Sequence, residues 1–258
     1  MANDRQRQIS NLVFALGQAA APAITPLLGL PFVGAISDRY PTYVVPAGYA
    51  FSIWSLIFAL SIAYAVWQML PAQRENPLLR RVGWLTAAAF AGSTLWQFAF
   101  PAGMYAVSVV LIVITLVSLA TAVGRMAGWR TPFTGAERWL VWIACGVYLG
   151  WITVATVANV AQALVAASVT ELGLGAEAWG MVMLIAAALI ASAVTLATRN
   201  AAYPLAVIWA LVAAFVARRA PPVVTRSDTV AYVALGAAAV VGVALLVAVM
   251  RSRRAARR

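Results

Sequence analysis

Three segments of the chain combine aromatic rings with neutral polar side chains inside long apolar runs. They begin at Pro46, at Ser93 and at Trp151, and extend to Ser55, Phe98 and Gln162. Aromatic rings offer flat faces for stacking, while hydroxyls and amides offer hydrogen bonds. In apolar surroundings this combination favours non-covalent binding of a flat hydrophobic ligand that carries few polar atoms.

Helical spacing brings these side chains together. Residues three, four and seven apart share a helix face, so Phe51, Trp54 and Phe58 are expected on one face. Amides inside a membrane need a hydrogen-bond partner, so Asn159 is expected to face the protein interior. The candidate ligand-binding residues are the aromatic, small and amide side chains of these faces: Trp54, Phe51, Phe58, Trp96, Tyr148, Trp151, Ala155, Asn159 and Gln162.

A purely structural role is the alternative for these residues. Polar side chains hold membrane helices together, and tryptophans collect where a helix meets the lipid headgroups. We assign that structural role to the tryptophans expected at helix ends, which are Trp67, Trp84, Trp129, Trp139 and Trp209.

Other kinds of chemistry lack the residues that they need. The chain has no histidine and a single cysteine, Cys145, and its seven acidic residues fall in loops or at helix ends. We therefore expect no catalytic residue, no metal site and no intrachain disulfide. Proton relays and ion-coupled pumps need ionisable groups at membrane depth, and none is expected here.

Long apolar runs predict the elements that position the candidates. A span needs about 20 apolar residues. Eight helices are predicted, near residues 10–29, 47–70, 82–100, 104–124, 138–167, 178–197, 201–217 and 229–250. Of the 258 residues, 64% are hydrophobic and 10% are charged, against about 25% charged in soluble domains. The fold class is therefore all-α, a polytopic bundle in a membrane.

Arginine placement predicts the topology. All 18 cations are arginines, and with the N-terminus inside, only Arg39, Arg218, Arg219 and Arg226 fall outside. The other fourteen lie on the inner side, as the positive-inside rule requires, so both termini are predicted to be cytoplasmic. If 201–217 were re-entrant, the C-terminus would move outside. The arginines lie in short loops and in the tail, which indicates lipid contacts and not nucleic-acid binding.

At these same segments the chain resembles the tryptophan-rich sensory protein / translocator protein (TspO/MBR) family. The resemblance rests on the Pro-rich start and Trp54 of the second helix, Trp96 before a tight turn, and the helix-five pattern W-x-x-x-A-T-x-x-N from Trp151 to Asn159. It runs from about residue 10 to residue 168. The segment from Ile36 to Tyr49 is similar to a longer bacterial branch with extra C-terminal helices.

The resemblance implies a division of the chain and a class of ligand. Residues 1–168 would form a five-helix domain that binds tetrapyrroles, such as porphyrin or haem, or sterols. Residues 169–258 would be accessory helices with an arginine-rich tail. The sequence departs from the family pattern at Phe51-Ser52-Ile53, where Gly-Pro is usual, and at Ser93 or Thr94, where Asn is expected. These departures bear on ligand identity more than on fold.

The function expected is a binding or sensory protein in a bacterial inner membrane, with transport of the same hydrophobic molecules as the alternative. Its partners would be the lipid bilayer, the ligand and, as a candidate, a second copy of the chain. We expect a non-covalent tetrapyrrole ligand and no covalently bound cofactor. A third alternative, an enzyme that degrades porphyrin, is implied only by the resemblance to the family.

The predicted topology can be tested with reporter fusions at the C-terminus. A cytoplasmic reporter should be active there, because the arginine bias keeps the five tail arginines inside. Activity of a periplasmic reporter at that position would contradict eight spans and favour seven.

Overall fold

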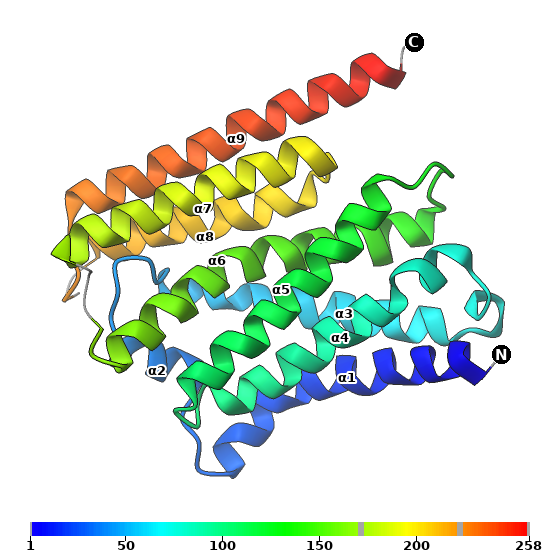
Figure 1. Ribbon diagram of the computed structural model, residues 1–258, viewed down its shortest axis with the longest axis horizontal. Helices are drawn as coiled ribbons and strands as arrows, with labels where there is room; N and C mark the ends of the chain where they lie inside the picture. Colours follow the sequence, from blue (N-terminus) through cyan, green and yellow to red (C-terminus); the bar gives the residue numbers. More distant parts are fainter. Residues whose placement is uncertain (1, 170–172, 221–223, 257–258) are drawn as a thin grey trace. The chain divides into compact units, whose positions relative to one another are not determined.

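The computed structural model describes residues 2–169, 173–220 and 224–256, and these residues form helices and their connections (Figure 1). The long helices are α1 (Ala2–Leu27), α3 (Ile53–Met69), α4 (Pro77–Ala99), α5 (Tyr105–Ala127), α6 (Ala144–Ala166), α7 (Ala176–Thr198), α8 (Ala202–Arg219) and α9 (Asp228–Ala256). Shorter elements are α2 (Val33–Arg39), the 3-10 turns η1 (Gly48–Ser52) and η2 (Pro71–Gln73), and the π-helical turn η3 (Glu137–Ile143). The eight helices predicted from the sequence all occur, and α2 is an addition.

Within the part of the chain that the structure describes, six helical stretches are long and apolar enough to cross a membrane. They are Gly48–Met69, Tyr105–Ala127, Glu137–Ala166, Ala176–Thr198, Ala202–Arg219 and Asp228–Arg254. Helices α1 and α4 are not among the six, because polar residues interrupt them. The all-helical membrane bundle is thus supported, while the count of eight spans stays a prediction. The range 201–217 forms one continuous helix.

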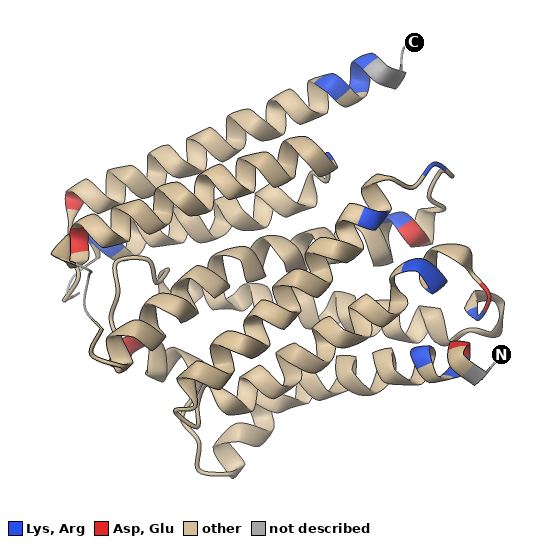
Figure 2. Ribbon diagram, in the orientation of Figure 1, with Lys and Arg blue, Asp and Glu red and all other residues tan. Residues whose placement is uncertain are grey.

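Charged residues gather at helix ends and connections, and the middles of the helices carry none that the structure describes (Figure 2). Two of these arginines are buried. Arg7, in α1, is 1% exposed, and Arg218, in the last turn of α8, is 3% exposed. Both sit at helix ends as predicted, but the protein covers their side chains.

The chain folds into two compact units. Unit 1 contains residues Met1–Val33 and Ile53–Leu149, and unit 2 contains Gly34–Ser52 and Gly150–Arg258. The sequence predicted that residues 1–168 bind the ligand and that residues 169–258 are accessory, and this assignment of roles stays a prediction. The compact units do not divide there: α7, α8 and α9 share unit 2 with a segment from the first fifth of the chain.

In unit 1, helix α4 packs along both α1 and α5. Its small residues let the helices approach closely, since a Cβ added to Gly92 would lie 2.6 Å from the Thr115 hydroxyl oxygen and 3.1 Å from the Leu111 carbonyl. At one end, Arg81 donates to the Arg125 carbonyl at 3.2 Å, which sets the antiparallel register of α4 and α5.

Buried polar side chains fix α1 against α3 and α4. The Asn11 amide donates to the Gly83 carbonyl at 2.7 Å, and its oxygen accepts from the Thr86 hydroxyl at 2.7 Å. Thr86 in turn lies 2.9 Å from the Tyr64 hydroxyl. Each group finds its partner inside the protein, as apolar surroundings require.

An exposed ion pair continues this register at the start of α1. Arg80 donates two hydrogen bonds to the Asp4 carboxylate, at 3.1 and 2.8 Å. The hydrogen bonding and charge of Arg80 lower the pKa of Asp4. The resulting stabilisation is present above the ordinary pKa of an aspartate and is lost as the pH falls through the lowered pKa.

Unit 2 is built on α7, α8 and α9, with α9 packed along both of the others. The segment 34–52 lies on α8: the Ala47 amide donates to the Ala213 carbonyl at 3.1 Å, and the Trp209 indole donates to the Ala50 carbonyl at 3.1 Å. Residues that precede the second long helix are thus held by a helix formed about 160 residues later.

Substitution at Gly92 tests the close packing of α4 on α5. We expect Gly92→Ala to destabilise the fold by about 1–3 kcal/mol, because the added methyl overpacks the contact with Thr115. Gly124→Ala is the matched control, since a Cβ there meets no atom within 4 Å. Unfolding in detergent micelles measures both variants, and equal stability of the two would contradict this packing.

Candidate functional site

The aromatic residues of unit 1 form a continuous cluster. We define this aromatic cluster by its ring-to-ring contacts, which link Tyr64, Phe90, Tyr148, Trp54, Phe58, Trp96, Phe100 and Tyr105. The rings come from α3, α4, α6 and the start of α5, so that helix packing places them together. Four of the nine sequence candidates belong to it.

Four rings of the cluster lie nearly parallel. Trp54 and Phe58, one helical turn apart on α3, have centroids 5.4 Å apart and planes at 27°. Trp54 and Trp96 are 6.1 Å apart at 26°, and Trp96 and Phe100 are 5.2 Å apart at 11°. Trp96 is 6% exposed, whereas Trp54 and Phe58 are half-buried. The partly accessible end of the stack is therefore on α3, where a further flat ring system could join it.

Polar groups lie beside the stack. Tyr148 meets Trp54 edge-on at 6.1 Å and donates its hydroxyl proton to the Gln18 side-chain oxygen at 2.7 Å. The Gln97 amide donates to the Gln18 carbonyl at 2.8 Å. Gln18 is fully buried, and its side-chain nitrogen has no partner among the described residues. This nitrogen is a hydrogen-bond donor that remains available next to the aromatic rings.

The other five candidates lie in unit 2. Phe51, in η1, meets Trp151 edge-on at 5.7 Å. Along α6, Trp151, Asn159 and Gln162 are buried and Ala155 is half-buried. The burial of Asn159, at 2% exposed, confirms that it faces the interior. The side-chain nitrogen of Gln162 reaches the Ser37 and Tyr40 carbonyls at 3.4 and 3.5 Å, so this amide also holds the segment before η1.

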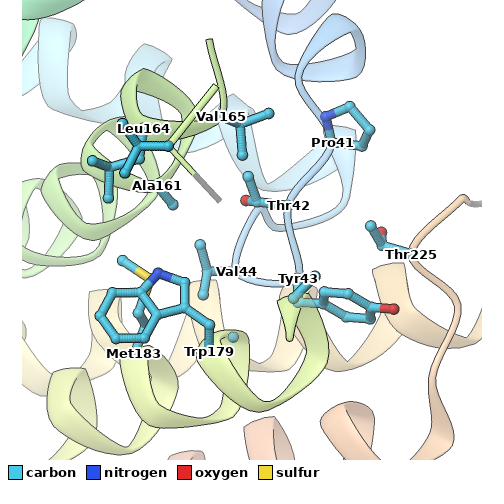
Figure 3. Close-up of a pocket in the computed structure, with 13 residues that line it drawn as sticks. Pro41, Thr42, Tyr43, Val44, Ala161, Leu164, Val165, Trp179, Met183 and Thr225 are labelled. Carbon is cyan, nitrogen blue, oxygen red and sulfur yellow. The ribbon is translucent and has the colours of Figure 1, made fainter. Parts of the chain in front are cut away.

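Unit 2 also contains an apolar cavity of about 180 Å³ (Figure 3). Segment 41–44, the end of α6 and the start of α7 enclose it. In Figure 3, Trp179 and Met183 of α7 lie on one side and Leu164 and Val165 of α6 on another. None of the nine sequence candidates lines this cavity.

Comparison with known proteins places this chain in a family. The family model described as TSPO-like protein matches residues 8–247. The chain belongs to the TSPO-like protein family. Searches of the curated proteins and of the solved structures found no match. The TSPO-like match confirms the resemblance and extends it, because the sequence resemblance ended near residue 168 and the match includes α7, α8 and most of α9.

Within this TSPO-like fold, Phe51 precedes the α-helix that carries Trp54 and Phe58. Residues 48–52 form a 3-10 turn and α3 begins at Ile53, so the face predicted for all three on one α-helix stays a prediction. Phe51 contacts Trp151 in unit 2, whereas Trp54 and Phe58 contact each other in unit 1. The structure thus assigns the nine candidates to two groups, and their role as one ligand site stays a prediction.

Sequence reasoning missed several residues of the TSPO-like interior. Gln18, Asn11 and Tyr64 all make buried hydrogen bonds in unit 1. A signal for the first two was available, because Asn11 and Gln18 are seven residues apart and therefore share a face of the first helix. No sequence pattern indicated Trp179 or the cavity that it lines.

Removing the Tyr148 hydroxyl tests the polar support of the cluster. We expect Tyr148→Phe to lower stability by about 1–3 kcal/mol, because Gln18 would lose a partner while buried. Tyr49→Phe, at a ring that is 47% exposed, should change stability little. Thermal unfolding in one detergent compares the two, and equal effects would contradict the hydrogen-bond argument.

Proposed function

We propose that this TSPO-like protein binds a flat hydrophobic ligand, of the tetrapyrrole or sterol class, against the aromatic cluster of unit 1. The observation that carries the proposal is the stack of nearly parallel rings that ends at the half-buried Trp54 and Phe58. A planar ligand gains dispersion energy and apolar burial by extending such a stack. Family membership supports membrane-embedded ligand binding or transport as the class of function.

Gln18 gives the proposed ligand one polar contact. Its side-chain nitrogen is buried beside Tyr148 and has no acceptor among the residues that the structure describes, so it can donate to a carbonyl or carboxylate oxygen of the ligand. A ligand acceptor there would relieve the cost of a buried, unpaired amide. The ligand would be held non-covalently. We assign no catalytic residue, since the sequence has no histidine and Cys145 is buried.

We propose eight membrane spans, with α1 and α4 joining the six apolar helices. Helix α4 lies beside α5, which is one of the six candidate spans. Arg81 contacts Arg125 at one end of the pair, and the rings of Phe100 and Tyr105 meet at the other end, so α4 is about as long as this span. Its 23 residues extend about 34 Å, enough for a bilayer core. Both termini would then lie in the cytoplasm of a bacterial cell, with the chain in the inner membrane.

The partners of the protein would be the lipid bilayer and the ligand. A second copy of the chain is a further candidate partner. We propose no binding of nucleic acid.

Titration of protoporphyrin into the full-length protein tests the proposed function. Quenching of tryptophan fluorescence reports binding in one membrane mimetic. We expect Trp54→Ala to raise the Kd by about 2- to 12-fold, because a stacked aromatic contact contributes about 0.5–1.5 kcal/mol beyond its buried area. Trp139→Ala is the matched control, since Trp139 is 62% exposed and lies outside the aromatic cluster.

Equal affinity of the parent and Trp54→Ala would place the ligand elsewhere. Asn159→Leu tests the group in unit 2 on its own, and a raised Kd with unchanged thermal stability would support its predicted role. Flux of the same ligand into liposomes separates binding from transport. A protein that binds in the titration but gives no flux above empty liposomes is a binder or sensor.

A further inference from the structure

A second cavity in unit 2, of about 470 Å³, lies between residues 37–48 and the C-terminal end of α8. Arg218, Thr42 and Thr225 are among its lining residues. This cavity contains none of the aromatic cluster, so a ligand bound in it would be independent of the ligand proposed for unit 1.

Arg218 brings a buried positive charge to this cavity. Its guanidinium is 3% exposed and donates to the Thr42 carbonyl at 2.9 Å, the Val45 carbonyl at 3.3 Å and the Thr225 hydroxyl. It also lies 5.9 Å from the centre of the Tyr43 ring. These partners are all neutral, and no ion pair joins Arg218 to a carboxylate of the described residues. A buried guanidinium without a counter-charge is costly, so the site favours an anion.

Two buried polar groups at this cavity have no hydrogen-bond partner among the described residues. The Nε of Arg218 has no partner among the described residues, and neither has the Thr42 hydroxyl, which is 9% exposed. Nε and a terminal nitrogen of arginine form the edge that binds two oxygens of a carboxylate or phosphate. A hydroxyl donates to a third position on such an oxyanion.

The adjoining apolar cavity extends the site. It shares Pro41, Thr42 and Thr225 with the arginine-lined cavity, and its remaining lining is mostly apolar (Figure 3). Figure 3 shows the Thr42 side chain near the centre of the view, with Leu164 and Ala161 of α6 to one side and Trp179 of α7 below it. An apolar chain attached to the oxyanion would therefore pass from Arg218 toward Leu164 and Trp179.

We propose that unit 2 binds an amphipathic oxyanion, a carboxylate or phosphate joined to an apolar chain, with Arg218 and Thr42 as its oxyanion ligands. Arg218 lies in the last turn of a candidate span, the depth at which lipid headgroups meet a membrane protein. The source of the oxyanion is an anionic lipid or a free amphiphile. Asp38 also lines the cavity, but its side chain is exposed and water screens its repulsion.

The test uses the full-length protein in nanodiscs of phosphatidylcholine, which carries no net charge. Calorimetry measures binding of octyl phosphate and octanoate, with octanol as the uncharged control for partitioning. We expect octyl phosphate or octanoate to bind the protein beyond the partitioning into lipid that octanol shows, and octanol to show partitioning alone. Parallel nanodiscs that contain phosphatidylglycerol identify the source: competition by that lipid indicates a lipid site, and its absence indicates a free amphiphile.

Thr42→Val separates binding from a structural role. The Thr42 hydroxyl has no partner among the described residues, so its replacement should leave the melting temperature of the empty protein unchanged or raise it. The same substitution should raise the Kd of the amphiphile about tenfold, as loss of one charge-assisted hydrogen bond predicts. Arg218→Gln should raise the Kd more than tenfold, whereas Arg219→Gln, at an exposed neighbour paired with Asp228, should leave it unchanged.

Unchanged Kd values in both Thr42→Val and Arg218→Gln would overturn the proposal. So would a parent protein that binds neither octyl phosphate nor octanoate and is not stabilised by phosphatidylglycerol. In that event Arg218 would serve only to hold Thr42 and Val45 against α8. If Arg218→Gln fails to fold, the Thr42→Val comparison alone decides, since that variant retains every hydrogen bond of Arg218.

Discussion

Polar groups in apolar surroundings must find their partners within the protein, and this requirement organises both units. In unit 1 the chain of hydrogen bonds from Gly83 through Asn11 and Thr86 to Tyr64 fixes the register of α1, α3 and α4. That register brings Gln18 beside Tyr148 and thereby supports the aromatic cluster. In unit 2, Arg218 donates hydrogen bonds to two carbonyls of the segment before η1, those of Thr42 and Val45, and so holds this segment on α8.

The same requirement explains why a few unsatisfied atoms are informative. Buried polar atoms usually have a partner, so each exception invites an explanation. The Gln18 nitrogen lies beside stacked rings, and the Thr42 hydroxyl and Arg218 Nε lie at a cavity. The two places suit different ligands, since the first offers a neutral donor among aromatics and the second a fixed positive charge.

The sequence predicted the helices well, because long apolar runs depend only on hydropathy and length. It also predicted that Asn159 is buried, since an amide in a membrane needs a partner. It placed the start of the second helix near residue 47, whereas residues 48–52 form a 3-10 turn and the α-helix begins at Ile53. It gave no indication that residues 40–50 pack on α8, since contacts between distant segments leave no periodic pattern in a single sequence.

The hydrogen bond from Arg218 to the Thr42 carbonyl joins residues 176 positions apart. During synthesis at about 5–20 residues per second, α8 emerges roughly 9–35 s after Thr42. The segment before η1 is therefore made long before the helix that anchors it, and the rest of unit 1 is synthesised in the interval. Unit 2 can close only after α8 has been made, so helices far along the chain complete a unit that begins with residues 34–52.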